Sequence, residues 1–564
     1  MLEELRFIAK FIKMRLTEKD NLFEQKDPRL SRLDDIDEIE AISTQYDAGL
    51  VPKDIDVLII GAGMGGLTCG SLVARDGKRV LVLEQGKKAG GCTKVFSFDK
   101  YPEYEMPIGC HYIAGAVKNT IYKAIFDEAS LNQLAFHELP ERFDEIIFEK
   151  ENVRFLAGEK AVFQQDLIER FPKEEKAIKS FVSLCFEFLN QREELAVLRI
   201  APGFIRTIMK LFMARTFIKY DETEHGEWLN ANIKDPVLRG ILSYMCVALG
   251  IDPDEAPFPI MAICFAVFLD GVSYPVGGPE SFARKVAKAI KLFDGTVLCN
   301  AEVSEILLSD DDKATGVLLS NGDTIHAKTI VSSCGYIKTY KSFLPERFHY
   351  VVKGLEPGCQ HFITFLGFKG GQDDLQLPRE NIYLARDAMH FTDPTFRDQK
   401  EIGDSVPLGP LFINFPTAHQ PQPGRSIAVI AMEARYDWFE KWKDNKDDEY
   451  RAVCERLMHR VTDKFFEKFG ALKQHLVFSE FTTPLDTARW IGSPDGSSFT
   501  TKLNQKRVLE QTQKTPIQNL YLTGADTFLA NGITVAAISG LITAQMILEK
   551  NLIGMIQKKY NLQG

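Results

Sequence analysis

Two short apolar runs flank a helical pattern near the start of the chain. The runs lie at residues 57–60 and 80–83, and apolar positions between them follow helical spacing as far as Arg75. Gly77 interrupts that spacing. Apolar runs of this length are typical of strands that are buried on both faces. The pattern therefore predicts a strand, a helix and a second strand.

Similar patterns continue along the chain. Residues 140–270 look mostly helical, and residues 345–480 alternate between strand and helix patterns. Strands are expected at residues 296–303, 314–319, 324–333, 362–368, 411–415, 427–433 and 520–523, and helices at 280–292, 450–469 and 535–548. A chain that mixes strands and helices in this order is expected to adopt an α/β fold.

Composition narrows the class of protein. The chain has 564 residues, 45% of them hydrophobic and 26% charged, which is typical of a globular protein with a large core. The 68 basic and 78 acidic residues give a net charge of −10, which argues against a nucleic-acid partner. Ten scattered cysteines without a C-x-x-C pair favour reduced core thiols and no metal site.

No segment has the pattern of a signal peptide or a membrane span. The first twenty residues carry charges throughout, and the longest apolar candidate, residues 256–269, contains two prolines and is expected to be buried. These features predict an intracellular protein, either cytoplasmic or attached to a membrane surface.

The turn after the first strand has the spacing G-x-G-x-x-G at Gly61, Gly63 and Gly66. The first glycine allows a tight turn, the second lets a pyrophosphate approach the backbone, and the third lets the helix pack close to the strand. Glu84 ends the second strand, where a carboxylate binds ribose hydroxyls. The stretch predicts dinucleotide binding.

Two further turns carry candidate chemistry. Gly90 and Gly91 let the chain pass close to a flat or phosphate-bearing ligand, and Asp526 follows the strand near the C-terminus, where a carboxylate can hold a ribityl or ribose hydroxyl. The helix start that follows would present free N–H groups to a second polar end of the ligand. A dinucleotide held by both ends of the chain would be long, as FAD is. His111 and Tyr112 lie in a glycine-bounded turn, where a structural or a ligand-facing role is open.

Three surface segments are also predicted. Residues 2–16 have the spacing of a basic amphipathic helix, which would lie on a membrane or pack on the protein itself. Residues 195–220 place large apolar side chains among cations only, a pattern typical of a helix at an anionic bilayer, although a packed helix remains possible. The acidic run at residues 34–40 is expected to be a solvated linker.

Several motifs together resemble one family. They read GAGMGG, LEQGKKAGGC, GCHYIAG, YPVGGPESFARKVAKAI, LFINFPTAHQPQPGRS and NLYLTGAD. These stretches resemble the phytoene-desaturase-type FAD oxidoreductases, and within them the branch of the retinol saturases and carotenoid isomerases. The resemblance covers residues 54–550. Cys92 stands where the family often has arginine after the Gly-Gly pair.

The resemblance implies FAD as the cofactor. It implies that Glu84 binds the adenosine ribose, that Val303 contacts adenine through its backbone, that Asp526 holds the ribityl–phosphate end, and that residues 533–535 face the flavin ring. The complete set of implied cofactor contacts is Gly61, Ala62, Gly63, Gly65, Gly66, Glu84, Gln85, Gly90, Gly91, Val303, Gly524, Asp526, Ile533, Thr534 and Val535.

The resemblance also implies a domain organisation. A discontinuous, Rossmann-like FAD-binding domain would contain residues 51–140, 275–340 and 505–550, and an α+β substrate-binding domain would contain residues 141–274 and 341–504 with possible membrane-contact helices. Residues 1–50 would form an N-terminal helix and linker.

The implied activity is an FAD-dependent oxidoreduction of carbon–carbon double bonds in a long apolar polyene. The expected reaction saturates one double bond of all-trans-retinol or a related retinoid or carotenoid, with His111 and Tyr112 as candidate proton donors or orienting groups. The alternatives are a carotenoid or polyunsaturated fatty-acid isomerase or desaturase, and a non-catalytic FAD-bearing lipid binder. No second G-x-G-x-x-G occurs at a strand–helix junction, so NAD(P)H or another external electron donor would bind only transiently.

Overall fold

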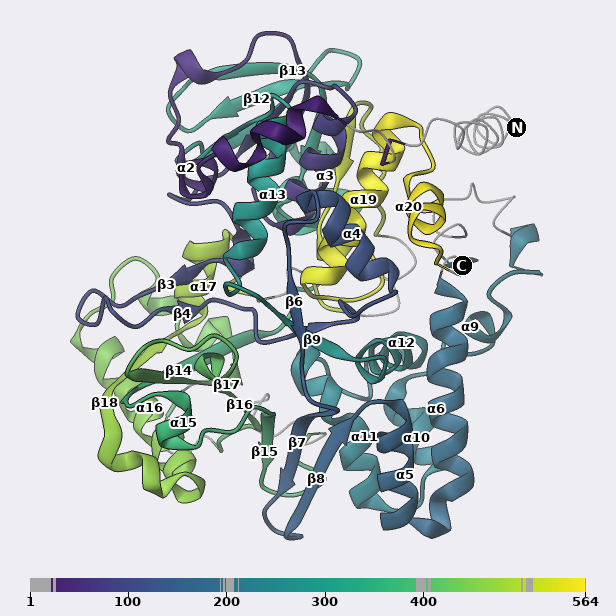
Figure 1. The fold of residues 1–564 in the computed structure, drawn as a ribbon, viewed down its shortest axis with the longest axis vertical. Helices are drawn as coiled ribbons and strands as arrows, with labels where there is room; N and C mark the ends of the chain where they lie inside the picture. Colours follow the sequence, from purple (N-terminus) through teal and green to yellow (C-terminus); the bar gives the residue numbers. More distant parts are fainter. Residues whose placement is uncertain are drawn as a thin grey trace.

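The protein is built on two large sheets, each covered by helices. The computed structural model describes residues 22–23, 27–192, 194–195, 198, 207–210, 212–391, 402–403, 407–493, 495–498, 501–503 and 511–562. In Figure 1 the upper part contains β13, α3 and α19, and the lower part contains β14–β18 and a group of helices around α6. Each part has a seven-stranded sheet. The predicted combination of an α/β part and an α+β part is confirmed.

The first sheet combines strands from distant parts of the sequence. Its parallel strands have the order β10-β2-β1-β13-β19, and β13 continues beyond them into an antiparallel hairpin with β12 and β11. The bounds are β1 (Ile55–Ile60), β2 (Val80–Leu83), β10 (Thr296–Leu298), β11 (Val303–Leu308), β12 (Ala314–Leu319), β13 (Thr324–Ser332) and β19 (Leu520–Leu522). Residues near both ends of the chain therefore share one sheet.

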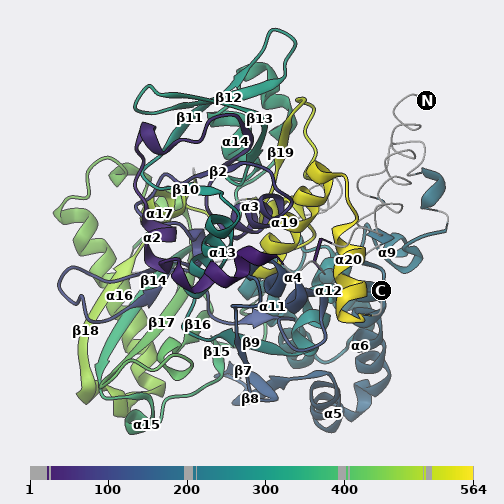
Figure 2. The same ribbon diagram turned by 45° about the horizontal axis from the view of Figure 1, so that its top comes forward.

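Strand β1 is buried on both faces, as its apolar run predicts. Val57 and Ile59 contact the apolar cluster under the helices, whereas Leu58 and Ile60 contact the cluster on the opposite face. The helices on the first face are α3 (Met64–Arg75), α4 (Ile121–Ser130), α13 (Ser281–Leu292), α19 (Ile533–Leu548) and α20 (Leu552–Tyr560), and α14 (Tyr336–Ser342) lies on the second. Figures 1 and 2 both show α19 beside α3.

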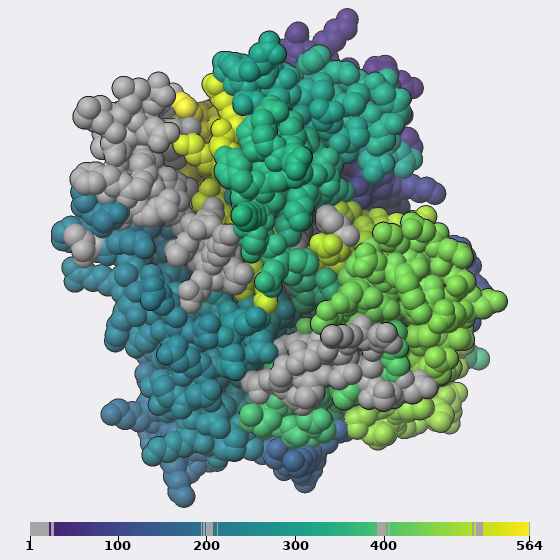
Figure 3. Space-filling model, turned by 180° about the vertical axis from the view of Figure 1, so that it is seen from behind, coloured from purple at the N-terminus to yellow at the C-terminus, as the bar shows by residue number. Residues whose placement is uncertain are grey.

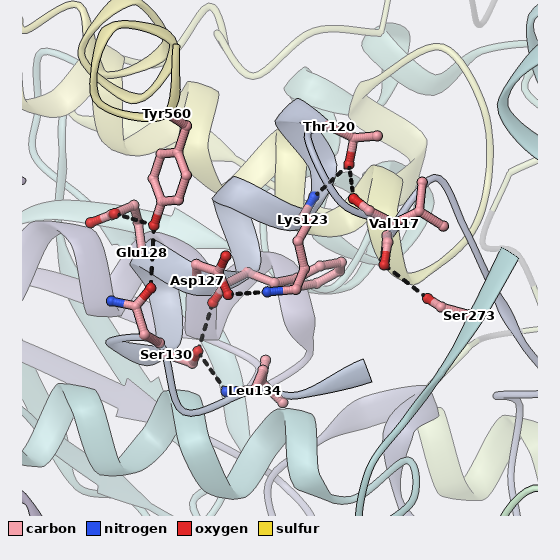
Figure 4. Close-up of polar contacts among 12 residues, drawn as sticks. Val117, Thr120, Lys123, Asp127, Glu128, Ser130, Leu134, Ser273 and Tyr560 are labelled. Carbon is pink, nitrogen blue, oxygen red and sulfur yellow. Dashed lines mark hydrogen bonds and ion pairs between the residues drawn. The ribbon is translucent and has the colours of Figure 1, made fainter. Parts of the chain in front are cut away.

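A buried carboxylate fixes the C-terminal helix α20 to this layer. Glu128 on α4 accepts hydrogen bonds from the Tyr560 hydroxyl at 2.7 Å and the Lys559 ammonium at 2.5 Å. Its other oxygen accepts from Arg75 of α3 at 2.8 Å. Figure 4 shows the Tyr560–Glu128 contact beside the Lys123–Asp127 pair of α4.

Seen from behind, only small areas of the yellow C-terminal segment are visible at the surface (Figure 3).

The second sheet is mostly antiparallel and has the strand order β18-β14-β17-β16-β15-β7-β8. Its strands are β7 (Arg142–Phe148), β8 (Val153–Gly158), β14 (Gln360–Lys369), β15 (Asn381–Ala385), β16 (Leu411–Asn414), β17 (Arg425–Ala434) and β18 (Leu476–Thr482). One face packs on a helical layer that contains α5 (Lys160–Arg170), α6 (Glu175–Asn190), α10 (His225–Asn232), α11 (Pro236–Leu249) and α12 (Phe258–Leu269). The other face packs on α16 (Asp448–Lys468).

Short strands join the two parts. In one small sheet, β5 (Ile113–Ala114) and β6 (Phe136–Glu138) pair with β9 (Val272–Pro275). In another, β3 (Val95–Phe96) pairs with β4 (Met106–Pro107). Strand β5 follows His111 and Tyr112 directly, so these pairings fix the position of that turn.

Several sequence predictions are wrong in detail. Residues 140–270 are not mostly helical at their start, because 142–148 and 153–158 form the paired strands β7 and β8. The strand expected at 296–303 is two strands, since Asn300 takes a left-handed conformation between them, with φ +53°.

The acidic run at residues 34–40 is mostly exposed, as a solvated segment should be, but it is not a linker. It runs into α2 (Glu38–Ser43), where Glu38 pairs with Lys285 and Lys288 of α13 and Glu40 pairs with Lys291 at 2.6 Å. Three cations on one helix face therefore hold this segment against the first layer.

The apolar and basic segment at residues 195–220 is not one continuous helix where the structure describes it. Ala214 has a left-handed conformation, and α9 (Arg215–Lys219) begins after it. Phe217 is buried, whereas Ile208 and Phe212 are 45% and 70% exposed. Phe204, Leu211 and the amphipathic pattern of residues 2–16 lie outside the described residues.

Among the described residues, no one helix has both the length and the apolar character needed to cross a membrane. Helices α19 and α20 meet the criterion only when taken together, and they are bent by 119° at the break between them.

Candidate functional site

The glycine turn after β1 leaves space in front of α3. Gly61 has φ +94°, which favours glycine, and a Cβ on Gly66 would lie only 2.2 Å from the Gly61 carbonyl oxygen. A Cβ on Gly63 would meet nothing within 4 Å. Gly61 and Gly66 are thus required by the fold itself, whereas nothing in the described structure requires glycine at Gly63.

Glu84, which follows β2, hydrogen-bonds to the glycine turn after β1. Its Oε2 accepts a hydrogen bond from the Ala62 amide at 3.0 Å, and its Oε1 accepts one from the Gly86 amide at 2.9 Å. Its backbone carbonyl accepts from Ala301, two residues before Val303, at 2.9 Å. The neighbouring Gln85 side chain accepts from Lys338 at 3.0 Å. The predicted ribose and adenine contacts therefore lie side by side.

The Gly90–Gly91 turn lies directly on the first glycine turn. Both glycines have positive φ, +133° and +54°. The Gly90 amide donates to the Ala62 carbonyl at 2.8 Å, and a Cβ on Gly91 would lie 3.1 Å from Cα of Gly63. A side chain at Gly91 would therefore enter the space between the two turns, whereas one at Gly90 would meet Lys94, Thr93 and Ala283.

The C-terminal turn meets the same helix end. A Cβ on Gly65 would lie 2.8 Å from the Gly524 nitrogen, so α3 and the turn after β19 are in close contact. Asp526 is buried, and its Oδ2 accepts a hydrogen bond from the Tyr336 amide at 2.8 Å. The structure thus brings the two predicted halves of the site together.

Helices α3 and α19 both have a glycine as the N-cap, which supplies no side-chain cap, and in the first turn of α3 the Gly66 amide donates to the Ser333 hydroxyl at 3.2 Å. By contrast, side chains cap α4, α11, α16 and α20. Helix α19 starts at Ile533, two residues before the predicted start. Its first turn, residues 533–536, is only half-buried, although most of its later residues are buried or nearly so. Each helix start therefore offers N–H groups and a positive dipole end, and the first turn of α3 lies against Gly540 in the middle of α19.

Comparison with known proteins identifies the family. The model of the family described as "Flavin containing amine oxidoreductase" matches residues 64–548. The chain belongs to this family. Membership implies FAD as the cofactor.

Individual relatives agree with that assignment. The chain is 28% identical to an all-trans-retinol 13,14-reductase of Danio rerio over 542 residues, which cover 90% of this chain and 88% of the relative. It is 25% identical to prolycopene isomerase 1 of an Oncidium hybrid cultivar over 509 residues, which cover 88% and 84% of the two chains. The solved structure of cyclohexylamine oxidase from Brevibacterium oxydans superposes with a TM-score of 0.58 at 15% identity, covering 88% of this chain and 99% of that one, and so supports the fold.

The geometry of this flavoprotein fits its cofactor. The open space at Gly63, the two helix starts with glycine at the N-cap and the half-buried first turn of α19 are the features that a long dinucleotide requires. When bound, the flavin supplies two-electron redox chemistry. Contact between the cofactor and the predicted residues stays a prediction.

His111 is half-buried and packs against an aromatic ring. Its ring centroid is 4.8 Å from that of Phe412, and its buried Nδ1 has no hydrogen-bond partner among the described residues. Burial lowers the pKa of His111 to about 4, and the Asn414 side chain offsets part of that effect. The imidazole is therefore neutral at pH 7, which suits it to orient a ligand and not to act as a cationic acid.

Tyr112 points into a buried polar network. Its hydroxyl donates to Oδ2 of Asp144 at 3.1 Å and lies 3.2 Å from the Tyr383 hydroxyl. Tyr244 donates to the same carboxylate oxygen at 3.2 Å, and Asn381 donates to Oδ1 at 3.1 Å. The network continues from Asn381 to Asn414, at 2.6 Å.

The sequence prediction missed every member of this network except Tyr112. Asp144 lies on β7, opposite Asn381 of β15 in the parallel pairing, and Tyr244 lies on α11. The signal available was a pair of adjacent acids, Asp144 and Glu145, inside the mostly apolar stretch RFDEIIF, which the helical prediction for residues 140–270 obscured.

Burial governs the electrostatics of the network. It raises the pKa of Asp144 to about 7, against the opposing effect of hydrogen bonds from Asn381, Tyr112 and Tyr244. Burial also raises the pKa of Tyr112, Tyr244 and Tyr383 well above the usual value. The site therefore holds neutral hydroxyls around one carboxyl that changes charge near neutral pH.

Proposed function

We propose that this flavoprotein reduces one carbon–carbon double bond of a long apolar polyene of the retinoid class. The observation that carries the proposal is the similarity to the all-trans-retinol 13,14-reductase of Danio rerio across about nine-tenths of both chains. The apolar surroundings of His111 and Tyr112 support it, because the rings of Phe412 and Phe268 lie 4.8 Å and 5.2 Å from theirs.

Different residues of the chain would bind the cofactor and supply the proton. Residues of the two glycine turns, with Glu84 and Asp526, would hold the adenine and phosphate parts of FAD, and the first turn of α19 would face the flavin ring. Thr534 in that turn donates to the Ala114 carbonyl at 3.2 Å, which fixes the segment of Tyr112 next to it. The Tyr112 hydroxyl would supply the proton that completes the reduction.

The electrons would come from an external donor. The sequence contains no second dinucleotide fingerprint at a strand–helix junction. A nicotinamide cofactor that binds transiently, a quinone or another redox protein would therefore reduce the flavin.

Membrane contact would give the enzyme direct access to its substrate, because apolar polyenes partition into bilayers. The exposed side chains of Ile208 and Phe212 are followed within eleven residues of the sequence by the exposed cations Arg215 and Lys219. Apolar groups among cations favour an anionic lipid surface. We propose that this segment is the contact.

A second candidate function is double-bond isomerisation without net reduction. It is favoured by the similarity to prolycopene isomerase 1, which covers 88% of this chain. The two functions differ in whether the flavin transfers electrons to the substrate in a net reduction.

Flavin absorbance separates the two functions. The holoprotein is photoreduced and mixed anaerobically with all-trans-retinol, a carotene or a polyunsaturated fatty acid. A reductase returns its flavin to the oxidised spectrum with its own substrate, and we expect this with the retinoid. An isomerase leaves the flavin reduced while the polyene spectrum changes. If no polyene reoxidises the flavin, the proposed reduction is wrong.

A further inference from the structure

Asp144 is a fully buried carboxyl that accepts hydrogen bonds from two hydroxyls and one amide. We propose that Asp144 stores the proton that Tyr112 passes to the substrate, so that Asp144 acts through Tyr112 as a positioning and proton-supplying residue. This inference rests on the proposed reduction of a polyene.

No cation neutralises Asp144 within the described part of the chain. The two arginines nearest on β7 and β8 have other partners: Arg142 pairs with Asp166 at 2.7 Å, and Arg154 pairs with Glu145. An unpaired buried carboxylate is costly, and it lowers that cost by taking up a proton. The site therefore favours a neutral acid that can release its proton when a reaction requires it.

The hydroxyl network can be satisfied in either charge state. When Asp144 is ionised, Tyr112, Tyr244 and Asn381 all donate to it, and Tyr383 can donate to Tyr112. When Asp144 is protonated, it can donate to the Tyr112 oxygen, and Tyr112 can then turn its own proton toward Tyr383 at 3.2 Å. A proton can thus move along the network while every polar group keeps a partner.

Tyr112 is the member of the network whose chain segment contacts the first turn of α19. Tyr244 and Tyr383 are buried, whereas Tyr112 is half-buried. Tyr112 lies two residues before Ala114, which accepts the hydrogen bond from the first turn of α19. The proposed path runs from Asp144 through the half-buried Tyr112 toward the place where the flavin ring is expected.

The proton transfer balances with the proposed reduction. The Tyr112 O–H bond breaks as a C–H bond forms at one carbon of the double bond, and the other carbon receives a hydrogen with two electrons from the reduced flavin, which is the reductant. The Asp144 O–H bond breaks as the Tyr112 O–H bond re-forms. The Asp144 carboxylate, held by Tyr244 and Asn381, then takes a proton from water.

The test compares wild-type holoprotein with D144N and with E145Q. Asn keeps the shape of Asp144 but stores no acidic proton, and Glu145 is the next acid on β7, on the opposite face. Infrared spectra collected between pH 5 and pH 9 follow the carboxylic-acid C=O band. The wild type and E145Q should show a component that disappears near neutral pH, and D144N should lack it. Besides Asp144, the titratable groups that face this position are Tyr112, Tyr244 and Tyr383, and none of them carries a carboxyl band.

Kinetics supply a second readout. D144N should keep its flavin-to-protein ratio and its KM while kcat falls about 10²-fold, within the range measured for loss of general acid catalysis. D144N should also lose the alkaline limb of the kcat–pH profile, and D144E should restore that limb at a shifted pH. If Asp144 had a purely structural role, these substitutions would neither remove the alkaline limb of the kcat–pH profile nor shift the pH at which it occurs.

The inference is overturned if D144N keeps the titrating band or if its kcat–pH profile matches that of the wild type. If D144N does not fold, D144E decides: a titrating band at a shifted pH supports the inference, and an unshifted band contradicts it. A wild-type protein that reduces no polyene would contradict the proposed function while leaving the Asp144 titration in place. A wild-type protein that reduces retinoid but lacks the titrating band would contradict only the role of Asp144.

Discussion

Glu84 accepts a hydrogen bond from the Ala62 amide at 3.0 Å, and this contact joins the end of β2 to the glycine turn after β1. The same side chain also accepts from Gly86, so both carboxylate oxygens are engaged by backbone N–H groups. Glu84 thus shapes the turn that is expected to hold the dinucleotide, in addition to its predicted ribose contact.

Replacing Glu84 or Asp526 with alanine should lower flavin occupancy. Each change removes a carboxylate at one end of the expected cofactor and leaves a buried amide without its acceptor, at Ala62 and at Tyr336 respectively. An unsatisfied buried amide costs about 1–3 kcal/mol. The flavin-to-protein absorbance ratio measures occupancy, and denaturant unfolding of the flavin-free protein measures stability. Unchanged ratios in both variants would remove these residues from the cofactor site.

Gly63 and Gly66 should respond differently to alanine. G63A places its Cβ in open space, so the flavin-free protein should keep its stability while flavin binding weakens. G66A drives a Cβ against the Gly61 carbonyl, 2.2 Å away, and should lower the free energy of unfolding by roughly 1–3 kcal/mol before any ligand is added. G470A, also in open space but far from these turns in the sequence, is the control for both. Full flavin binding by G63A would show that the cofactor lies elsewhere.

Asp144 should make the flavin-free protein less stable as the pH rises from 4 to 7. Its pKa is about 7 in the folded protein, against an ordinary value of 3.8, so in this window the folded state holds a proton that the unfolded state has lost. The contribution of Asp144 to the free energy of unfolding is full below pH 4. It falls by roughly 1.4 kcal/mol for each pH unit between pH 4 and pH 7, and it is gone above pH 7. D144N should lack this component, so the difference in unfolding free energy between the two proteins should change across the window and stay constant above it. A constant difference from pH 4 to pH 7 would show that Asp144 has an ordinary pKa.

The exposed apolar side chains beside α9 should carry membrane adhesion. Changing Ile208 and Phe212 to serine removes side chains that are 45% and 70% exposed, so folding should be unaffected while co-sedimentation with anionic vesicles decreases. Changing Val477, which is 44% exposed on β18, to serine is the matched control. Equal co-sedimentation of all three proteins would exclude this segment as the contact.

The sequence predicted the glycine-containing turns better than the polar network around Asp144. Gly61, Glu84 and Asp526 belong to short motifs whose local geometry the residue types dictate, so the turns could be placed without the fold. The Asp144 network draws its members from separate segments, and only the pairing of β7 with β15 brings Asp144 and Asn381 together.

The failed predictions have physical reasons of the same kind. The acidic run at residues 34–40 is solvated as expected, but the sequence did not show that it pairs with the lysines of α13, because these lie far along the chain. The strand expected at 296–303 ends early because Asn300 takes up a left-handed conformation, which an apolar pattern does not reveal. Local patterns predict elements, whereas charge pairing and strand ends depend on tertiary contacts.

The mass of the product from one anaerobic turnover tests the central claim most directly. The reduced holoprotein is mixed with all-trans-retinol without oxygen, and the product is analysed by mass spectrometry. The proposed reduction predicts a product two hydrogens heavier than the substrate. A product of equal mass, which indicates isomerisation, or one two hydrogens lighter, which indicates desaturation, would contradict it.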